Sequence, residues 1–220
     1  MVVDLVTDRA KKIIELLTKE YPDARVALDF TNPWELLVAT VLSAQCTDKK
    51  VNQVTKHLFA KYPAMHDYAH VSLSEFEQEI KTLGLYRNKA KNIISAAKIV
   101  IEKFGSEVPR TMEEMLILPG VARKTANIVL GNAYGVVEGV AVDTHVKRLS
   151  TRLGLTKEKD PNKIEKDLMN IFPRRDWFSL NYLLINHGRA ICKAKNPLCD
   201  DCVLSGDCPS AFNFPRFVHD

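Results

Sequence analysis

The sequence lacks any long hydrophobic run, and no segment approaches the roughly 20 apolar residues that a membrane-spanning helix needs. Its first residues show no basic stretch followed by an apolar one, and no leader rich in Arg and Ser, so we expect no export or organelle signal. A large excess of one charge is also missing. Lys and Arg number 31 against 27 Asp and Glu, a net charge of +4 that permits a nucleic-acid partner without requiring one. We therefore expect a cytoplasmic protein.

Cysteine is scarce, and its distribution is uneven. Only Cys46 lies outside a stretch of seventeen residues that holds the other four, Cys192, Cys199, Cys202 and Cys208. In a reducing compartment, clustered cysteines indicate metal binding rather than disulfides. The spacing Cys-x6-Cys-x2-Cys-x5-Cys suits a structural zinc ion and an iron–sulfur cluster about equally.

Runs of strictly alternating polar and apolar residues, which would indicate strands, are also missing. Apolar residues recur instead at spacings of three and four, as in amphipathic helices. Helix starts are predicted at Thr7, Asn32-Pro33, Asp48 and Asp160-Pro161, and Ser72 with Glu75 predicts a capping box. Together with short connections, this pattern predicts a compact all-α protein of about ten helices.

One connection, Leu118 to Thr125, combines a turn with positive charge. Pro119-Gly120 is typical of a tight turn, and a helix is predicted to begin near Ala122. Backbone N–H groups at a helix start bind phosphate, and Arg123 and Lys124 add charge there. An ordinary corner between two helices, with two solvated basic residues, explains the same pattern about as well.

Lys124 and Asp143 are the candidate reactive pair. Asp143 follows an apolar stretch and precedes a helix, so its simplest role is that of an N-cap. A helix and a short loop separate it from Lys124, which could bring the two together. Partial burial or a neighbouring cation such as Arg123 would make the lysine a better nucleophile. Asp143 would then accept a proton or stabilise a cationic transition state.

Two further polar breaks interrupt the helical pattern. Ser43 to Asp48 contains Gln45, which is by default a surface loop residue. Gly84 to Arg87 places Leu85 at the tip of a loop. A leucine in a loop is usually tucked into the core, but an exposed one could act as a wedge between base steps of DNA.

With these motifs in view, the sequence resembles the endonuclease III family of helix-hairpin-helix DNA glycosylases over nearly its whole length. Residues 42–48 are similar to the segment that fills the space left by a flipped base, and Gly84-Leu85-Tyr86 to the intercalating loop. Residues 118–127 resemble the hairpin with its catalytic lysine, and residues 142–145 the motif of the catalytic aspartate. The cysteine spacing is that of the family's [4Fe–4S] cluster.

The resemblance implies two helical domains: a six-helix barrel with the helix-hairpin-helix at residues 26–136, and a cluster domain built from residues 1–25 and 137–220. It implies a bifunctional glycosylase and abasic-site lyase that removes oxidised pyrimidines from double-stranded DNA and cleaves the abasic site by β-elimination through a lysine Schiff base. We expect a monomer of the prokaryotic type, located in the cytoplasm at the nucleoid. Lys124 and Asp143 are then catalytic, and the cysteines at 192, 199, 202 and 208 bind the cluster. DNA contacts are expected from Gln45, Leu85, Pro119, Gly120, Val121, Ala122, Arg123, Thr125, His145, Arg148, Arg189, Lys193 and Lys195.

The hairpin departs from the family pattern at one position. The family usually reads Leu-Pro-Gly-Val-Gly, and this sequence has Ala122 at the second glycine. Alanine would cost about 1 kcal/mol or more if that position needs a positive φ, and would fit well in a first helical turn.

Lys124 argues against the family's adenine–mismatch glycosylases, which lack the lysine. It also argues, together with Asp143, against a non-catalytic DNA-binding protein, and the basic hairpin has no purpose in a small iron–sulfur electron carrier.

Overall fold

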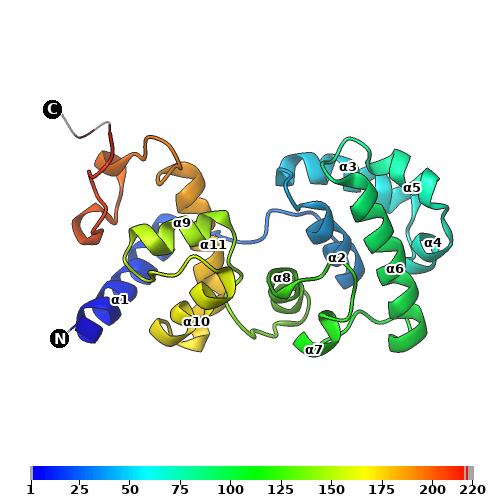
Figure 1. Ribbon diagram of the computed structural model, residues 1–220, viewed down its shortest axis with the longest axis horizontal. Coiled ribbons are helices and arrows are strands. Elements are labelled where there is room, and N and C mark those ends of the chain that lie inside the picture. Colours follow the sequence, from blue (N-terminus) through cyan, green and yellow to red (C-terminus); the bar gives the residue numbers. More distant parts are fainter. Residues whose placement is uncertain (1, 216, 218–220) are drawn as a thin grey trace. The chain divides into compact units, whose positions relative to one another are not determined.

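The computed structural model describes residues 2–215 and 217, and over these residues it is all-helical. The described part of the chain forms eleven α-helices and two short 3-10 helices, and it contains no strand, which confirms the predicted fold class (Figure 1). None of the helices described is both long and apolar enough to cross a membrane. The chain divides into two compact units, Ala27–Glu138 and a second formed by the residues up to Val26 together with those from Gly139 onward.

Two helices are central to the packing of the unit Ala27–Glu138. Its elements are α2 (Pro33–Leu42), α3 (Asp48–Lys61), α4 (Met65–His70), α5 (Leu73–Ile80), α6 (Tyr86–Phe104), α7 (Met112–Met115) and α8 (Arg123–Tyr134). Helix α2 is almost wholly buried and contacts α3, α6 and α8. Helices α4 and α5 pack along α6, so that α6 and α2 together hold the turns at their ends in place (Figure 1).

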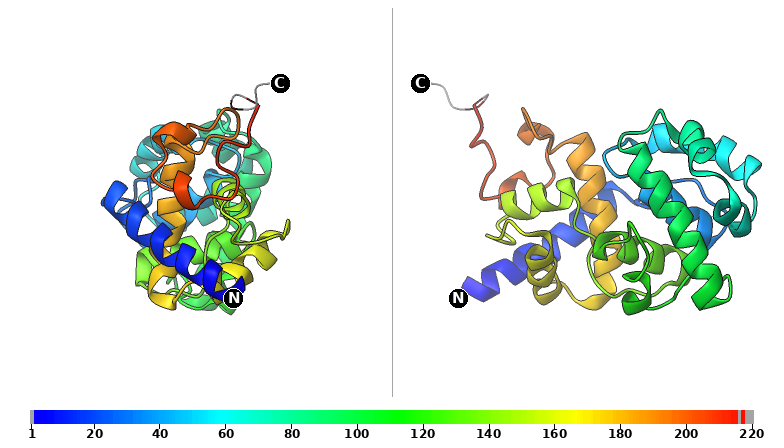
Figure 2. Two further views of the ribbon diagram at one scale, coloured as in Figure 1. Left: turned by 90° about the vertical axis from the view of Figure 1, so that its left-hand side faces the viewer. Right: turned by 45° about the vertical axis from the view of Figure 1, so that its right-hand side comes forward.

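The second unit joins the two ends of the chain. It contains α1 (Val2–Glu20), α9 (Thr144–Arg152), α10 (Pro161–Ile171), α11 (Arg174–Ala190) and the 3-10 helices η1 (Cys199–Asp201) and η2 (Ser205–Asp207). Helix α1 packs against α11 and α10, and α9 packs against α11 (Figure 2). A single apolar cluster that includes Ile13, Leu149, Leu168 and Leu184 fills the space between these helices. The cysteine-containing tail follows α11 directly.

Helix starts follow the predicted caps, with one exception. Asn32 caps α2 by accepting a hydrogen bond from the Glu35 amide at 2.9 Å, and Asp160 caps α10 in the same manner. Ser72 caps α5 through the amide of Glu75. The predicted start at Thr7 is wrong, because α1 already begins at Val2 and Thr7 lies inside it.

Candidate active site and metal centre

The turn that precedes α8 has the geometry its sequence predicts. The amide of Val121 donates to the carbonyl of Leu118 at 3.1 Å, which closes a four-residue turn with Pro119 and Gly120 in the centre. Gly120 has a φ of +79°, the left-handed value that the third position of a type II turn requires. The glycine also packs closely, since a Cβ there would lie 2.8 Å from Nδ2 of Asn92 on α6.

We therefore expect Gly120→Ala to distort the turn. The substitution combines a left-handed backbone, which costs an L-residue about 1–2 kcal/mol, with a steric conflict against Asn92. Binding to duplex DNA should weaken several-fold and thermal stability should fall, as measured by fluorescence anisotropy and by circular dichroism. Gly135→Ala, at another left-handed glycine with open space around its Cα, is the matched control. It should lower stability without weakening DNA binding, and equal binding losses in the two variants would contradict this account.

Helix α8 begins without a side-chain cap. Ala122 is its N-cap residue and has φ −98° and ψ 172°, an extended backbone that alanine adopts without strain. The departure from the family's second glycine therefore introduces no positive φ. Because the alanine side chain cannot accept hydrogen bonds as a Ser or Asp cap would, the N-cap residue leaves the first amides of α8 for another acceptor.

Lys124 lies in the first turn of this helix, with Arg123 before it and Thr125 after it. The partial burial considered from the sequence is not found, because the Lys124 side chain is exposed. Arg123 is partly buried, and its guanidinium donates to the carbonyl of Glu138 at 3.4 Å. Of the two basic residues, Lys124 is thus the one presented at the surface beside the turn.

Asp143 is the N-cap of α9, as its position in the sequence predicts. Its Oδ1 atom accepts hydrogen bonds from the amides of His145 and Val146, both at 2.8 Å. These bonds hold the carboxylate at the positive end of the helix, where a negative charge is favoured. Lys124 and Asp143 belong to different units of the chain, so their predicted proximity stays a prediction.

His145 and Arg148 lie one turn apart on α9 and contact each other. Nη2 of Arg148 is 3.1 Å from Nδ1 of His145 and also donates to the carbonyls of Gly188 and Cys192 at 2.8 and 2.9 Å. Burial lowers the pKa of His145; the Asp143 carboxylate opposes this shift, and the nearby Arg148 and Arg189 charges add to it. Arg148 therefore has a structural role in fixing the end of α11, and a contact of either residue with DNA stays a prediction.

The turns that carry Gln45 and Leu85 lie against each other. Both residues have left-handed backbones, with φ of 56° and 58°, and both side chains are exposed, Leu85 by 52%. A Cβ at Gly84 would lie only 3.8 Å from the carbonyl oxygen of Gln45, which shows how closely the two turns approach. Left-handed conformations at non-glycine residues cost about 1–3 kcal/mol each and persist where surrounding contacts impose them.

All four clustered cysteines line one cavity. Cys199 is buried and the other three are partly buried, and the lining also includes Arg152, Ile191, Pro197 and Phe214. Within residues 2–215 and 217, no three His, Cys, Asp or Glu side chains converge closely enough to hold a single metal ion. A zinc ion needs its ligands about 2.3 Å from one point, whereas a cluster of several irons separates them. Four cysteines that line one cavity supply the donor set that a [4Fe–4S] cluster takes, one thiolate for each iron.

The cysteines are supported by side chains that the sequence did not single out. The Arg152 guanidinium donates to Sγ of Cys192 at 3.3 Å and to the carbonyls of Lys193 and Ala194 at 2.7 and 3.0 Å. It also stacks on the ring of Phe214, 4.6 Å from the ring centre. One side chain thus fixes the loop that presents Lys193 and Lys195, both of which are exposed.

His187 contacts a second of the four cysteines, Cys202. Its Nε2 lies 3.3 Å from Sγ of Cys202, and its Nδ1 lies 3.0 Å from the Tyr21 hydroxyl. Burial lowers the pKa of His187 to about 4 and raises that of Tyr21 to about 12, so both are neutral at pH 7. Because a thiolate can only accept, Nε2 must be the donor to Cys202, and Nδ1 then accepts a hydrogen bond from the Tyr21 hydroxyl.

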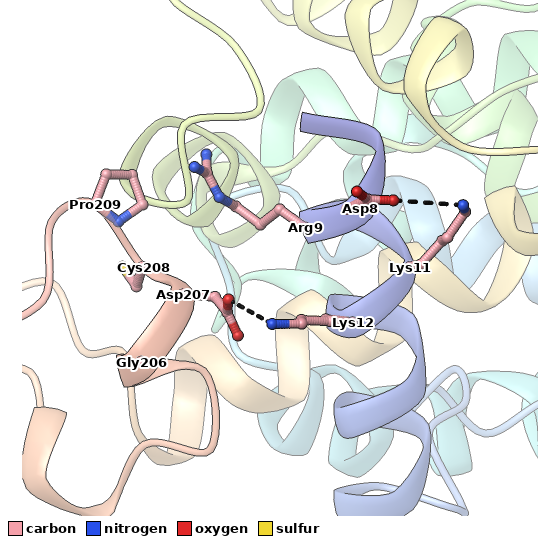
Figure 3. Close-up of a pocket in the computed structure, with 8 residues that line it drawn as sticks. All are labelled: Asp8, Arg9, Lys11, Lys12, Gly206, Asp207, Cys208 and Pro209. Carbon is pink, nitrogen blue, oxygen red and sulfur yellow. Dashed lines mark hydrogen bonds and ion pairs between the residues drawn. The ribbon is translucent and has the colours of Figure 1, made fainter. Parts of the chain in front are cut away.

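Helix α1 contacts the same cysteine segment from its other side. Lys12 donates to Oδ1 of Asp207 at 2.9 Å, next to Cys208, as Figure 3 shows. Arg9, one turn earlier, donates to the carbonyl of Leu153 at 3.0 Å. These contacts attach the N-terminal helix to the region around the cysteines.

Replacing Cys199, the most buried of the four, should abolish metal loading. We expect Cys199→Ser to lose essentially all of the visible absorbance of the loaded protein, because a cluster needs all four thiolates and gains its affinity from them together. Limited proteolysis should then cleave the chain beyond Ala190. Cys46→Ser is the control, since Cys46 lies in the other unit, and its absorbance should match the unchanged protein. Full absorbance in Cys199→Ser would contradict the assignment.

Comparison with known proteins agrees with these features. The sequence matches the HhH-GPD superfamily of base excision DNA repair proteins over residues 38–174 and the iron–sulfur binding domain of endonuclease III over residues 192–208. It is 54% identical to endonuclease III of Synechocystis sp. over 92% of this chain and 93% of that protein. The endonuclease III of Bacillus subtilis is 51% identical over 86% of each chain. A solved structure described as a trapped covalent endonuclease III–DNA intermediate superposes with a TM-score of 0.90 at 46% identity, covering 94% of this chain and 97% of that one.

The fold, the glycine turn with its lysine and the cysteine cavity together define a base-excision repair protein of the helix-hairpin-helix class. Within that class, the chain belongs to the endonuclease III family. It is a DNA glycosylase with abasic-site lyase activity, and its cofactor is a [4Fe–4S] cluster, as the resemblance predicted.

Proposed function

We propose that this enzyme removes oxidised pyrimidines from duplex DNA and cuts the strand at the resulting abasic site with Lys124 as the nucleophile. The observation that carries this proposal is the exposed Lys124 in the first turn of α8, directly after the Pro119-Gly120 turn and at an uncapped helix N-terminus. A lysine there is next to any phosphate that the amides bind, and within reach of the attached sugar.

Phosphate binding is the first step of the proposed mechanism. The amides at the start of α8 would hold the DNA backbone, and the turn formed by Pro119 to Ala122 would approach it closely because Gly120 carries no side chain. Arg123 and Thr125 flank this site. Arg189, Lys193 and Lys195 are exposed on the other unit and would add phosphate contacts there.

The base then leaves the stack, because the sugar carbon is unreachable in an intact duplex. Extrusion costs a few kcal/mol. Leu85, an exposed apolar side chain, would enter the stack as a wedge, and Gln45 would occupy the position of the lost base. Both side chains project from adjacent turns of one unit, so they can fill one hole together.

Covalent chemistry follows at the sugar. The free amine of Lys124 forms a bond to C1′ as the glycosidic bond to the base breaks, and the base leaves with the bonding electrons and gains a proton. Ring opening gives a Schiff base, and removal of a C2′ proton expels the 3′ phosphate by β-elimination. DNA bound over the exposed lysine would exclude water from the reacting atoms.

Asp143 would stabilise the positive charge that develops on the sugar as the base departs. Its two hydrogen bonds to the start of α9 fix the position of the carboxylate. His145 and Arg148 would contact DNA from the same helix, His145 as a neutral hydrogen-bonding group.

We propose that Ala27–Glu138 is the barrel domain with the helix-hairpin-helix, and that the other unit is the cluster domain. Cys192, Cys199, Cys202 and Cys208 would hold the cluster, which contributes structural cross-linking and takes no part in the covalent steps. The enzyme would act as a monomer in the cytoplasm, at the nucleoid.

The substrate assignment is tested with duplex oligonucleotides that each carry one lesion. Single-turnover excision should be fastest on an oxidised pyrimidine, at least about tenfold slower on an oxidised purine, and undetectable on undamaged DNA. Binding should weaken steeply as salt increases if phosphate contacts dominate. Faster excision of an oxidised purine would overturn the substrate assignment and leave the family membership unaffected.

A further inference from the structure

We propose that Lys89 is a positioning residue that holds the Gln45 and Leu85 turns together in the free enzyme, ready to enter DNA. This inference rests on the proposed roles of those two side chains. Lys89 is one turn into α6, and its side chain is only 4% exposed. A lysine so deeply buried cannot act as a surface phosphate contact, and its charge must be satisfied within the protein.

The side chain of Lys89 donates to a backbone carbonyl that loses its helical partner where α2 ends. If α2 continued, the carbonyl of Leu42 would accept a hydrogen bond from the amide of Cys46. That amide instead donates to the carbonyl of Ser43 at 3.0 Å, which closes the turn that contains Gln45. The Lys89 ammonium takes the vacant place and donates to the Leu42 carbonyl at 2.8 Å. It also lies 3.4 Å from Sγ of Cys46, the residue after Gln45.

The backbone of Lys89 holds the second turn. Its amide donates to the carbonyl of Leu85 at 3.1 Å, which is the first hydrogen bond of α6 after its left-handed N-cap residue. One residue therefore contacts both turns, Leu85 through its main chain and the Gln45 turn through its side chain. A single buried lysine thus holds both left-handed turns in place, so that Gln45 and Leu85 are already positioned before DNA binds.

This role predicts a selective defect. Without the Lys89 ammonium, the turn that carries Gln45 can adopt other conformations. Part of the free energy of DNA binding is then needed to order this turn again. Lys89→Met keeps the length and apolar stem of the side chain and removes its donors. Single-turnover excision of an oxidised pyrimidine paired in a duplex should fall about 10-fold or more, because small misplacements of positioning groups have effects of this size.

A second substrate separates positioning from general damage. The same lesion in an unpaired bulge needs little extrusion, so the defect of Lys89→Met should shrink there to about threefold or less. Borohydride trapping on a preformed abasic site should be nearly unchanged. Lys98→Met, at an exposed lysine of the same helix, is the control and should leave all three rates unchanged. Equal losses on paired and unpaired lesions would overturn the inference.

Two further sets of variants complete the experiment. Gln45→Ala and Leu85→Ala are measured on the same substrates, and if neither slows excision, the proposed wedge roles fail and this inference with them. If they slow excision and Lys89→Met does not, only the role of Lys89 is overturned. If Lys89→Met does not fold by circular dichroism, Lys89→Gln, which keeps a polar tip on a shorter stem, is measured in its place. The expected result is the same loss on the paired lesion and its rescue in the bulge.

Discussion

Lys124→Ala should abolish covalent chemistry while leaving a folded, DNA-binding protein. Excision coupled to strand cleavage is expected to fall at least about 10³-fold, since removing a nucleophile removes the pathway rather than weakening it. Stability should be unchanged, because Lys124 is exposed in the first turn of α8 and alanine is the best helix former. Single-turnover kinetics and thermal melting measure the two effects.

Lys98→Ala is the matched control for this variant, since it also removes an exposed helical lysine. Its excision rate should equal that of the unchanged enzyme. DNA binding by Lys124→Ala should remain, with a salt dependence shallower by about one phosphate contact at most. A Lys124→Ala enzyme that still cuts at a substantial rate would show that another group is the nucleophile.

Asp143→Asn should separate the two roles of Asp143. Asparagine is as good an N-cap as aspartate, so the hydrogen bonds to His145 and Val146 should persist and the melting temperature should change little. The negative charge disappears, and we expect base excision to fall about 10²–10³-fold, the range for one electrostatic group in a transition state. Cleavage of a preformed abasic site, which needs no glycosidic bond to break, should fall less.

Asp160→Asn offers a close control. Asp160 is the N-cap of α10 and accepts from the amides of Asn162 and Lys163, the same pattern that Asp143 shows on α9. Its substitution should affect stability as Asp143→Asn does and leave excision unchanged. If the two variants are equally active, Asp143 is a cap and no more.

Local signals in the sequence located most helix starts. Asn32 is followed by proline, and Ser72 by glutamate three residues on, and each of these caps is present in the structure. Thr7 has neither signal, since Pro is absent after it and Ala10 stands three residues on. A threonine costs little inside a helix, so α1 extends through it to Val2. A threonine without these neighbouring signals is therefore too weak an indication of where a helix begins.

The turn before α8 was predictable because its chemistry is local. Gly120 has the left-handed backbone that glycine adopts readily, the proline before it is typical of the second position of such a turn, and the helix follows at once. The backbone at Ala122 was not predictable from the sequence, because both a positive φ and a helical start were compatible with the turn. The structure shows a third, extended conformation that alanine also accepts.

Contacts between distant segments could not be inferred in this way. Arg152 and His187 reach the cysteines across 40 and 15 residues, and nothing in their immediate sequence indicates it. Lys89 did leave a signal. It falls on the buried face of α6 together with Ile93 and Val100, and a charged residue on such a face needs a partner inside the protein. Which partner it has depends on the packing of α6 against α2.

The central claim is that Lys124 forms the covalent bond to DNA, and mapping that bond tests it most directly. The enzyme is incubated with duplex DNA carrying one oxidised pyrimidine, the Schiff base is reduced with borohydride, and the cross-linked peptide is identified by mass spectrometry. The account predicts one modified peptide, with the sugar remnant on Nζ of Lys124. A modified peptide that carries the remnant on any other amine, or no cross-link while the base is still excised, would contradict it.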